Sequence, residues 1–256
     1  MTWATAPKKV DVDGRVLKGI ITETRSWIWR VKAGDKEAWD NDPSFECRAR
    51  LDGWKKDMTI TFDSKTTLKL FTQKITFLPG YEITIPEHNV ILLDNGRYQI
   101  EARDVSTAMS PTHSHSREPL KRKATTVDDL WDFHIEEGGI AGTIVHVHWK
   151  LQSGQQQPSL EECVFVATED AVERVYLRFD EKTLGQICAG QIPLVAGHRC
   201  GLFDWEEETH ENKRMVYKTV ADDFQAVYPH RDGFEPTLHY ELQKTAPPFM
   251  MGPQDD

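Results

Sequence analysis

The sequence predicts an all-β protein in which two small barrels follow one another, each with a short helical insertion. Two stretches of the chain follow one plan: each begins at a glycine-marked strand, after Gly14 or Gly138, and each has a later strand that follows Gly80 or Gly197. Alternating and β-branched segments dominate both stretches. The length of 256 residues also suits two domains of roughly 100 residues each.

The first stretch has the pattern of several short strands and one helix. Residues 16–31 are rich in isoleucine, valine and tryptophan. Residues 45–51 alternate strictly between apolar and charged side chains, so Arg48 and Arg50 share one face of their strand. We expect strands over residues 16–31, 45–51, 58–62, 74–77, 81–85, 90–93 and 98–102, and a helix over 66–72 that Asp63 or Ser64 caps.

The second stretch repeats this order. We expect its first three strands over residues 140–150, 162–167 and 174–179, followed by a capped helical turn over 180–187. Later strands end near Tyr228. The acidic residues 204–211 are expected to form a loop that joins two of these late strands.

Several short strands, one small helix after the third strand and then more strands form an order that resembles the OB-fold, a five-stranded Greek-key barrel. The resemblance covers most of residues 14–105 and 136–229 and depends on element order, since OB-folds have no diagnostic sequence motif. Tandem OB-folds are similar to single-strand DNA-binding and telomere-end-protection proteins, so the resemblance implies a role in binding single-stranded nucleic acid. A β-sandwich or another small barrel stays open, because strand order is not visible in the sequence.

Composition divides the chain into five parts. Serine, proline and histidine without apolar periodicity indicate a flexible linker between the two barrels. Whether the barrels pack against each other or swing on this linker stays open at this stage. The predicted parts are an N-terminal arm (1–13), a first OB-like barrel (14–105), the linker (106–130), an acidic second OB-like barrel (131–240) and a C-terminal tail (241–256).

The charge is distributed unevenly. The chain has a net charge of −10, which argues against nonspecific coating of duplex nucleic acid. Residues 1–105 hold 17 basic and 16 acidic side chains, whereas residues 131–256 hold 10 basic and 22 acidic ones. The first barrel is therefore the part expected to approach a polyanion. No segment has the pattern of a secretory signal or a membrane helix, so we expect an intracellular protein.

An aromatic and basic cluster in the first barrel is the leading binding candidate. Single-stranded nucleic acid is held by flat rings that stack on bases and by cations that follow phosphates. OB-folds present such groups on their second and third strands and on adjoining loops. The alternative is that the tryptophans belong to the barrel core and the cations are solvated. The cluster consists of Arg25, Trp27, Trp29, Arg30, Arg48, Arg50, Trp54 and Lys55.

A metal site and covalent catalysis both find little support. His146 and His148 alternate on one strand, and the string His-Val-His-Trp resembles the histidine strand of α-type carbonic anhydrases, but the neighbouring strand has no third histidine. The four cysteines form no C-x-x-C pair, and the chain contains no G-x-S-x-G elbow and no phosphate-binding glycine loop. We therefore expect no cofactor, no metal and no enzymatic activity, with a histidine-centred metalloenzyme as a distant alternative.

The second barrel is expected to serve as a protein-interaction or dimerisation module. Its acidic run offers a surface for a basic partner, and the apolar tail could dock as a short peptide. The residues chosen for this role are Trp205, Glu206, Glu207, Phe249 and Met250. The alternative function, in another class, is a structural subunit of a protein assembly that touches no nucleic acid.

Overall fold

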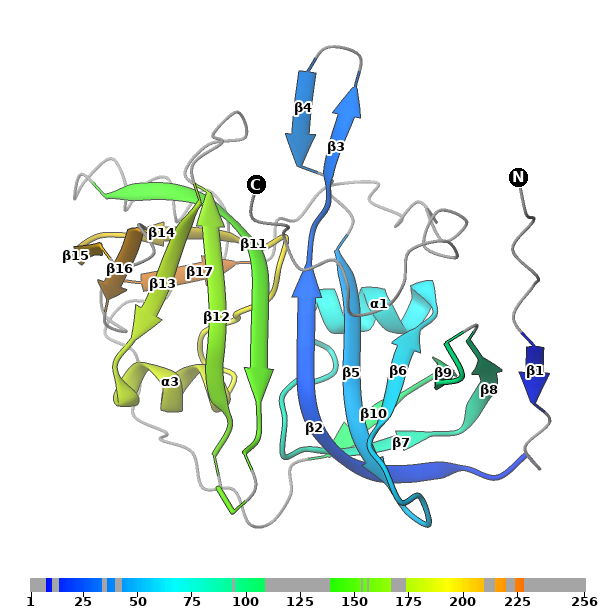
Figure 1. Ribbon diagram of the computed structural model, residues 1–256. Helices are drawn as coiled ribbons and strands as arrows, with labels where there is room; N and C mark the ends of the chain where they lie inside the picture. Colours follow the sequence, from blue (N-terminus) through cyan, green and yellow to red (C-terminus); the bar gives the residue numbers. More distant parts are fainter. Residues whose placement is uncertain are drawn as a thin grey trace.

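Two β-barrels lie side by side and share a sheet in the computed structural model (Figure 1). Within the described residues the chain forms one 15-stranded sheet, a separate two-stranded hairpin and two helices. The structure describes residues 8–10, 14–33, 36–39, 43–93, 95–108, 139–152, 154–155, 157–166, 174–209, 215–219 and 224–227.

The first barrel is a closed circuit of paired strands. β2 pairs antiparallel with β5, and β5 with β6, while β6 pairs parallel with β9. β8 pairs antiparallel with β9, and β7 with β10. β7 also pairs with β2, which closes the circuit. β7–β8 and β9–β10 each act as one bent strand, so the circuit has five strands and a helix between the third and fourth, as in the OB-fold. Its elements are β2 (Leu17–Trp27), β5 (Ser44–Leu51), β6 (Met58–Phe62), α1 (Ser64–Phe71), β7 (Glu82–Ile85), β8 (Glu87–Leu92), β9 (Tyr98–Arg103) and β10 (Ser106–Ala108).

The second barrel repeats the circuit strand for strand. β13 lies parallel to β16 as β6 does to β9, and β14 pairs with both β11 and β17 as β7 does with β2 and β10. The predicted fold class, all-β with two OB-like barrels and short helical insertions, is confirmed. The elements are β11 (Ile140–Lys150), β12 (Ser159–Val166), β13 (Val175–Phe179), α3 (Glu181–Cys188), β14 (Arg199–Leu202), β15 (Glu206–Thr209), β16 (Met215–Thr219) and β17 (Phe224–Val227).

The repeat extends to single hydrogen bonds. Asp63 and Asp180 cap the two helices, and each side chain accepts a bond from the main-chain N–H three residues later at 2.9 Å. Gly80 and Gly197 both have φ near 90° and donate to the carbonyls of Ile21 and Ile144 at 2.7 Å. Positive φ is accessible to glycine at no steric cost, which explains why glycine precedes this strand in both halves.

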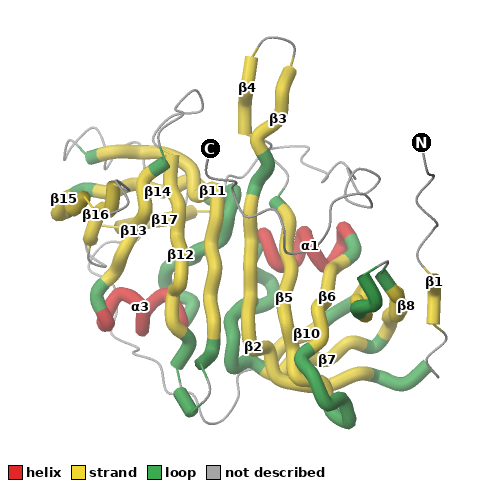
Figure 2. Tube along the Cα trace, in the orientation of Figure 1, coloured by secondary structure: helices red, strands yellow, loops and turns green. Residues whose placement is uncertain are grey.

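A seam between β2 and β11 joins the barrels into one continuous sheet. Residues 23–27 pair antiparallel with residues 146–150, and Arg25 lies directly opposite His148. Contacts around this pair are reciprocal: the hydroxyl of Tyr81 donates to the carbonyl of Cys188 at 3.3 Å, and His198 Nε2 lies 2.7 Å from the carbonyl of Phe71. The two halves are thus related by a pseudo-twofold axis between Arg25 and His148, with α1 and α3 on opposite sides of the seam (Figure 2).

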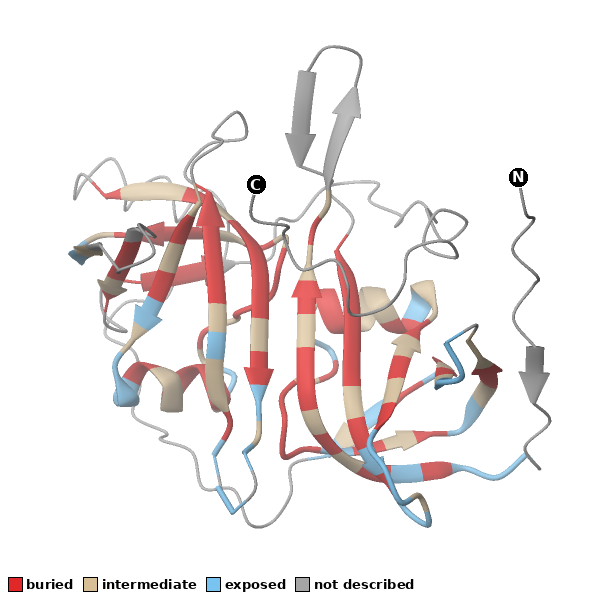
Figure 3. Ribbon diagram, in the orientation of Figure 1, coloured by how far each residue is buried: buried red, intermediate tan, exposed pale blue. Residues whose placement is uncertain are grey.

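One hydrophobic core continues through both barrels (Figure 3). Inward positions of the strands alternate with outward ones, and Ile60, Ile100 and Ile144 are fully buried. Each such side chain contributes about 1.5–3 kcal/mol when it is removed from water. Because Phe71 and Cys188 belong to the same cluster, the helix ends connect the two halves of the core.

Several expected elements differ from the observed ones. β2 ends at Trp27, where Ile28 turns its N–H to the carbonyl of Val145, and a separate hairpin follows, formed by β3 (Arg30–Ala33) and β4 (Lys36–Trp39). Residues 74–77 form no strand, because the N–H groups of Lys74 and Ile75 both bond to the end of α1 at the carbonyl of Lys69.

Strands also occur where we expected irregular segments. β1 (Lys8–Val10), within the predicted arm, pairs with β8, and β10 extends the first barrel to Ala108, three residues into the predicted linker. The acidic run is not a loop between strands, because its residues 206–209 form β15 and pair with β16. The rest of the predicted linker up to residue 138 and the predicted C-terminal tail lie outside the described residues.

Candidate nucleic-acid interface

The outer face of the first barrel presents a polar and cationic surface on its second and third strands. Cys47 and Ala49 point into the core, so Arg48 and Arg50 on β5 point outward. On β6, Thr61 also faces outward, and its hydroxyl accepts a bond from Gln99 Nε2 of β9 at 2.9 Å. This is the region with which OB-folds bind oligonucleotides.

Both arginines of this face have acidic partners. Arg50 Nε lies 3.2 Å from Asp57 Oδ1, and Arg48 Nη1 lies 3.7 Å from Glu23 Oε2. The side chains of Arg48 and Arg50 are 36% and 72% exposed. The Arg50–Asp57 pair is exposed and contributes about 0–1 kcal/mol, so a phosphate can compete with Asp57 for Arg50.

Arg25 and Trp27 lie on β2 at the seam, and Arg25 shares the Glu23 carboxylate with Arg48 of the outer face. Arg25 Nη2 lies 3.0 Å from Glu23 Oε1, and Trp27 is half-buried opposite His146 of β11. Trp29 is also half-buried, meets Trp27 edge to face with ring centroids 5.9 Å apart, and donates from Nε1 to Ser44 Oγ at 3.3 Å. Neither expectation, fully exposed stacking rings or fully buried core, describes these two tryptophans.

The turn between β5 and β6 carries two more of the predicted residues. Lys55 is exposed, whereas Trp54 is half-buried and packs against the core. Arg30 is the first residue of β3, and its side chain lies outside the described part. The structure therefore brings Arg48, Arg50 and the 54–55 turn together on one hairpin and places the other predicted residues at the seam and beyond it.

Sequence reasoning missed an exposed aromatic residue at the start of β9. Tyr98 is 47% exposed and follows a tight turn in which Gly96 has a φ of 75°. The N–H of Leu93 bonds to the carbonyl of Arg97 at 2.8 Å and closes this turn. The loop between the fourth and fifth strands is the second place where OB-folds contact oligonucleotides. The Asn95-Gly96 pair followed by an aromatic residue was the available signal.

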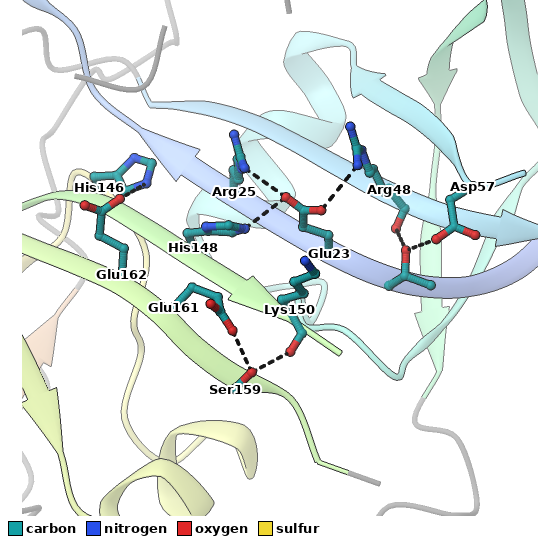
Figure 4. Close-up of polar contacts among 11 residues, drawn as sticks. Glu23, Arg25, Arg48, Asp57, His146, His148, Lys150, Ser159, Glu161 and Glu162 are labelled. Carbon is teal, nitrogen blue, oxygen red and sulfur yellow. Dashed lines mark hydrogen bonds and ion pairs between the residues drawn. The ribbon is translucent and has the colours of Figure 1, made fainter. Parts of the chain in front are cut away.

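The centre of the seam is a polar cluster formed by both barrels (Figure 4). Glu23 receives Arg25 and Arg48 from the first barrel, and His148 Nε2 of the second barrel lies 2.9 Å from its Oε1. Burial opposes ionisation of Glu23, but the hydrogen bond from His148 and the neighbouring positive charges together hold its pKa below the usual value. Burial raises the pKa of nearby Glu46 to about 7, although Arg25 and Arg48 oppose this.

The two histidines of the metal hypothesis have separate carboxylate partners. His146 Nε2 lies 3.2 Å from Glu162 Oε2, while His148 contacts Glu23. Among the residues that the structure describes, no three His, Cys, Asp or Glu side chains gather in a way that could hold a metal ion. All four cysteines are free and buried, and burial raises the pKa of the Cys188 thiol to about 12.

The predicted protein-interaction residues fall into two groups. Glu206 and Glu207 are exposed on β15, which ends the path of the sheet. Trp205 is half-buried, because its ring stacks on Tyr217 with centroids 5.5 Å apart. Trp205 is therefore part of the barrel wall, and its ring is not fully exposed to a protein partner. Phe249 and Met250 lie outside the described residues.

Comparisons with known proteins show only distant similarity. No protein-family model matches the chain, and no curated protein matches its sequence. The Ifi202 HINa domain in complex with a 20-base-pair double-stranded DNA is 10% identical over 83% of this chain and 96% of that chain, with a TM-score of 0.22. A murine DNA-binding protein bound with double-stranded DNA is 12% identical over 84% and 98%, at 0.20. Fission yeast Pot1 with single-stranded DNA is 11% identical over 94% and 89%, at 0.25.

Superpositions at such TM-scores assign neither a family nor a function to this chain. The OB-fold arrangement is instead established by the strand pairing itself. In the part of the chain that the structure describes, no helix is long and apolar enough to cross a membrane.

Proposed function

We propose that this protein binds single-stranded nucleic acid with the outer face of its first barrel and contacts a protein partner with its acidic second barrel, without catalysing a covalent reaction. The observation that carries the proposal is the cationic outer face of β5, where Arg48 and Arg50 lie beside the hydroxyl groups of β6. These groups match the two requirements of phosphate contact, positive charge and hydrogen-bond donors.

Two aromatic side chains lie at turns of this barrel. Tyr98 lies exposed beside the β8–β9 turn, and Trp54 lies in the β5–β6 turn. Stacking of a base on such a ring contributes about 1–3 kcal/mol. Charge agrees with this assignment, because the first barrel is close to neutral overall whereas residues 131–256 carry a large acidic excess that repels a polyanion.

Fluorescence anisotropy with labelled single-stranded and duplex oligonucleotides over a range of salt concentrations tests the proposal. With about four phosphate contacts, the slope of log K against log salt is expected to be near about −3. Arg48→Ala, Arg50→Ala and Tyr98→Ala should each weaken single-strand binding by about 3- to 10-fold. Lys74→Ala removes an exposed cation away from this face and serves as the matched control. Absence of binding at low salt would refute the proposal.

A second candidate is a structural subunit that touches no nucleic acid. The observation in its favour is that Arg48 and Arg50 already have carboxylate partners within the protein. In this case the arginines stabilise the hairpin and the seam. Arg50→Ala would then lower the free energy of unfolding by up to about 1 kcal/mol and leave oligonucleotide binding, if measured, unchanged.

A further inference from the structure

The second barrel is partly open where the first is closed. In the first barrel, β5 and β6 pair through four residue pairs, which include Cys47 with Ile60 and Glu46 with Thr61. In the second, the described residues of β12 and β13 form two pairs, Val164 with Tyr176 and Phe165 with Val175. Continuing that register would pair Cys163 with Leu177 and Glu162 with Arg178, but the strands diverge before these residues (Figure 1).

A cavity of about 400 Å³ occupies the place of the missing pairs. Its walls include Glu162 and Cys163 on β12 and Leu177 and Arg178 on β13. Adjacent residues of a strand point to opposite faces of the sheet. Because Glu162 and Cys163 are adjacent and both line the cavity, as do Leu177 and Arg178, the cavity passes between the two strands. Leu184 of α3, which packs against the core, also lines the cavity. The cavity is thus a gap in the barrel wall between two strand edges.

A β-bulge turns two carboxylates toward the mouth of this gap. On β11, His148 and Trp149 are consecutive, but their partners on β12 are Glu162 and Leu160, so Glu161 is an extra residue. Leu160 packs against the core and Cys163 is buried, whereas Glu161 is exposed and Glu162 half-buried. Both carboxylates therefore lie outside the core, and both line the cavity. The first barrel has no such bulge at the matching place on β5, and bulges often re-aim side chains at binding sites.

The gap has the features that an extended peptide needs. Where the β12–β13 ladder stops, main-chain groups of both strands face the cavity, and an added strand can pair with such an edge. Leu177 and Leu184 form apolar walls for alternate side chains of that strand. Glu161 and Glu162 outnumber the one cation of the lining, Arg178, and they lie in a half of the chain with 22 acidic and 10 basic side chains, which favours a positively charged occupant.

We propose that the gap between β12 and β13 is a binding site for an extended basic segment of a partner protein. The segment adds a short strand to the open edge, inserts an apolar side chain toward Leu184 and places a lysine or arginine at Glu161 and Glu162. The proposal deepens the protein-interaction role of the second barrel proposed above, and it does not depend on the nucleic-acid face of the first barrel.

Fluorescence polarisation with the full chain tests the site. The probe is a fluorescein-labelled heptapeptide in which arginine and valine alternate. Two control peptides have glutamate in place of arginine, or N-methyl groups on alternate amides that block strand pairing. The double variant Glu161→Gln, Glu162→Gln removes the charges, Leu184→Trp fills part of the cavity, and Glu82→Gln, Glu87→Gln removes two exposed charges on the first barrel. Circular dichroism and thermal melting establish that each variant folds.

We expect binding of the arginine peptide to weaken at least 10-fold in the Glu161→Gln, Glu162→Gln variant and in Leu184→Trp, and to change less than 2-fold in the Glu82→Gln, Glu87→Gln control. The glutamate and N-methyl peptides should bind at least 10-fold more weakly than the probe. Equal binding of the N-methyl peptide, or equal loss in the control variant, overturns the site, as does displacement of the probe by a single-stranded oligonucleotide.

Oligonucleotide binding measured on the same variants separates this proposal from the function of the first barrel. The gap variants should retain oligonucleotide binding, whereas Arg48→Ala should retain peptide binding. If the protein binds oligonucleotides but not the peptide, the proposal for the gap has failed. If it binds the peptide but not oligonucleotides, the proposal for the first barrel has failed.

Discussion

The outer faces of the two barrels differ in chemistry although their strands pair in the same way. Arg48 lies opposite Glu23 on the first strand of its barrel, and Val164 lies opposite His146, which occupies the same place in the second barrel. Arg48 is therefore matched by Val164 and Arg50 by Val166. The valines are buried in a small cluster with Ile28. The two copies thus share the residues that close a barrel and differ in those that face outward.

The matched glycines of the first strands are the strongest test of this shared closure. A Cβ added to Gly142 would lie 2.2 Å from the carbonyl oxygen of Val166 and 2.4 Å from the ring of Phe165; one on Gly19 would lie 2.3 Å from the carbonyl oxygen of Arg50. We expect Gly142→Ala and Gly19→Ala each to lower the free energy of unfolding by about 3 kcal/mol, with Gly142→Ala the more severe. Urea denaturation measures this. Gly14→Ala, which meets nothing within 4 Å, is the control and should change little.

His198 makes the second barrel sensitive to acid. Burial lowers the pKa of His198 to about 4, although its hydrogen bond to the carbonyl of Phe71 opposes the shift. As the pH falls, His198 is therefore protonated in the unfolded chain before it is protonated in the folded protein. The free energy of unfolding that is present above about pH 6.5 then decreases by up to about 3 kcal/mol as the pH falls toward 4. Tyr81 occupies the matching position of the first barrel.

His198→Tyr should remove this part of the pH dependence. Denaturation of the wild type and the variant between pH 4 and 8 gives the difference. If the wild type and His198→Tyr lose stability equally on acidification, His198 does not have the proposed role.

Glu46 should have the opposite effect in the first barrel. Its folded-state pKa of about 7 lies above the usual value, so the folded protein binds the proton more tightly than the unfolded chain. Stability is then lost as the pH rises from about 4.5 to 7, and Glu46→Gln should recover about 2 kcal/mol at pH 8 and little at pH 4.5. Unfolding curves at the two pH values decide this. Glu101→Gln, a half-buried carboxylate on β9, is the control.

The helix caps provide the smallest and most symmetrical comparison. Asp63→Ala and Asp180→Ala each remove one bond to a main-chain N–H, and each should cost about 1 kcal/mol. Asp180 also accepts a bond from the Thr183 hydroxyl, so its replacement should cost slightly more. Thermal melting of both variants measures the difference. A cost in one barrel only would show that the caps are not equivalent.

Local patterns in the sequence predicted many, but not all, of the elements of each barrel. The alternation of residues 45–51 predicted which side chains of β5 face outward, and Asp63 and Asp180 marked the helix starts. These signals depend on residues a few positions apart, where propensity and periodicity are informative.

The seam and the gap could not be predicted in the same way. Pairing between Arg25 and His148 joins residues far apart in the chain, and no local pattern shows which strand edge will meet another. The sequence therefore does not show that Arg25 and Trp27, which we expect on a binding face, also take part in this pairing. The bulge at Glu161 was hidden for a related reason, because it is defined by the register against β11.

The pseudo-twofold seam has a consequence for assembly. The β2 edge of one barrel is complementary to the β11 edge of the other, so the contact is the single-chain counterpart of an isologous dimer interface. If the seam opens at high concentration, the exposed edge of one molecule can pair with the complementary edge of another. Two molecules can then exchange barrels and form a closed, domain-swapped dimer that contains the same strand pairs as two monomers.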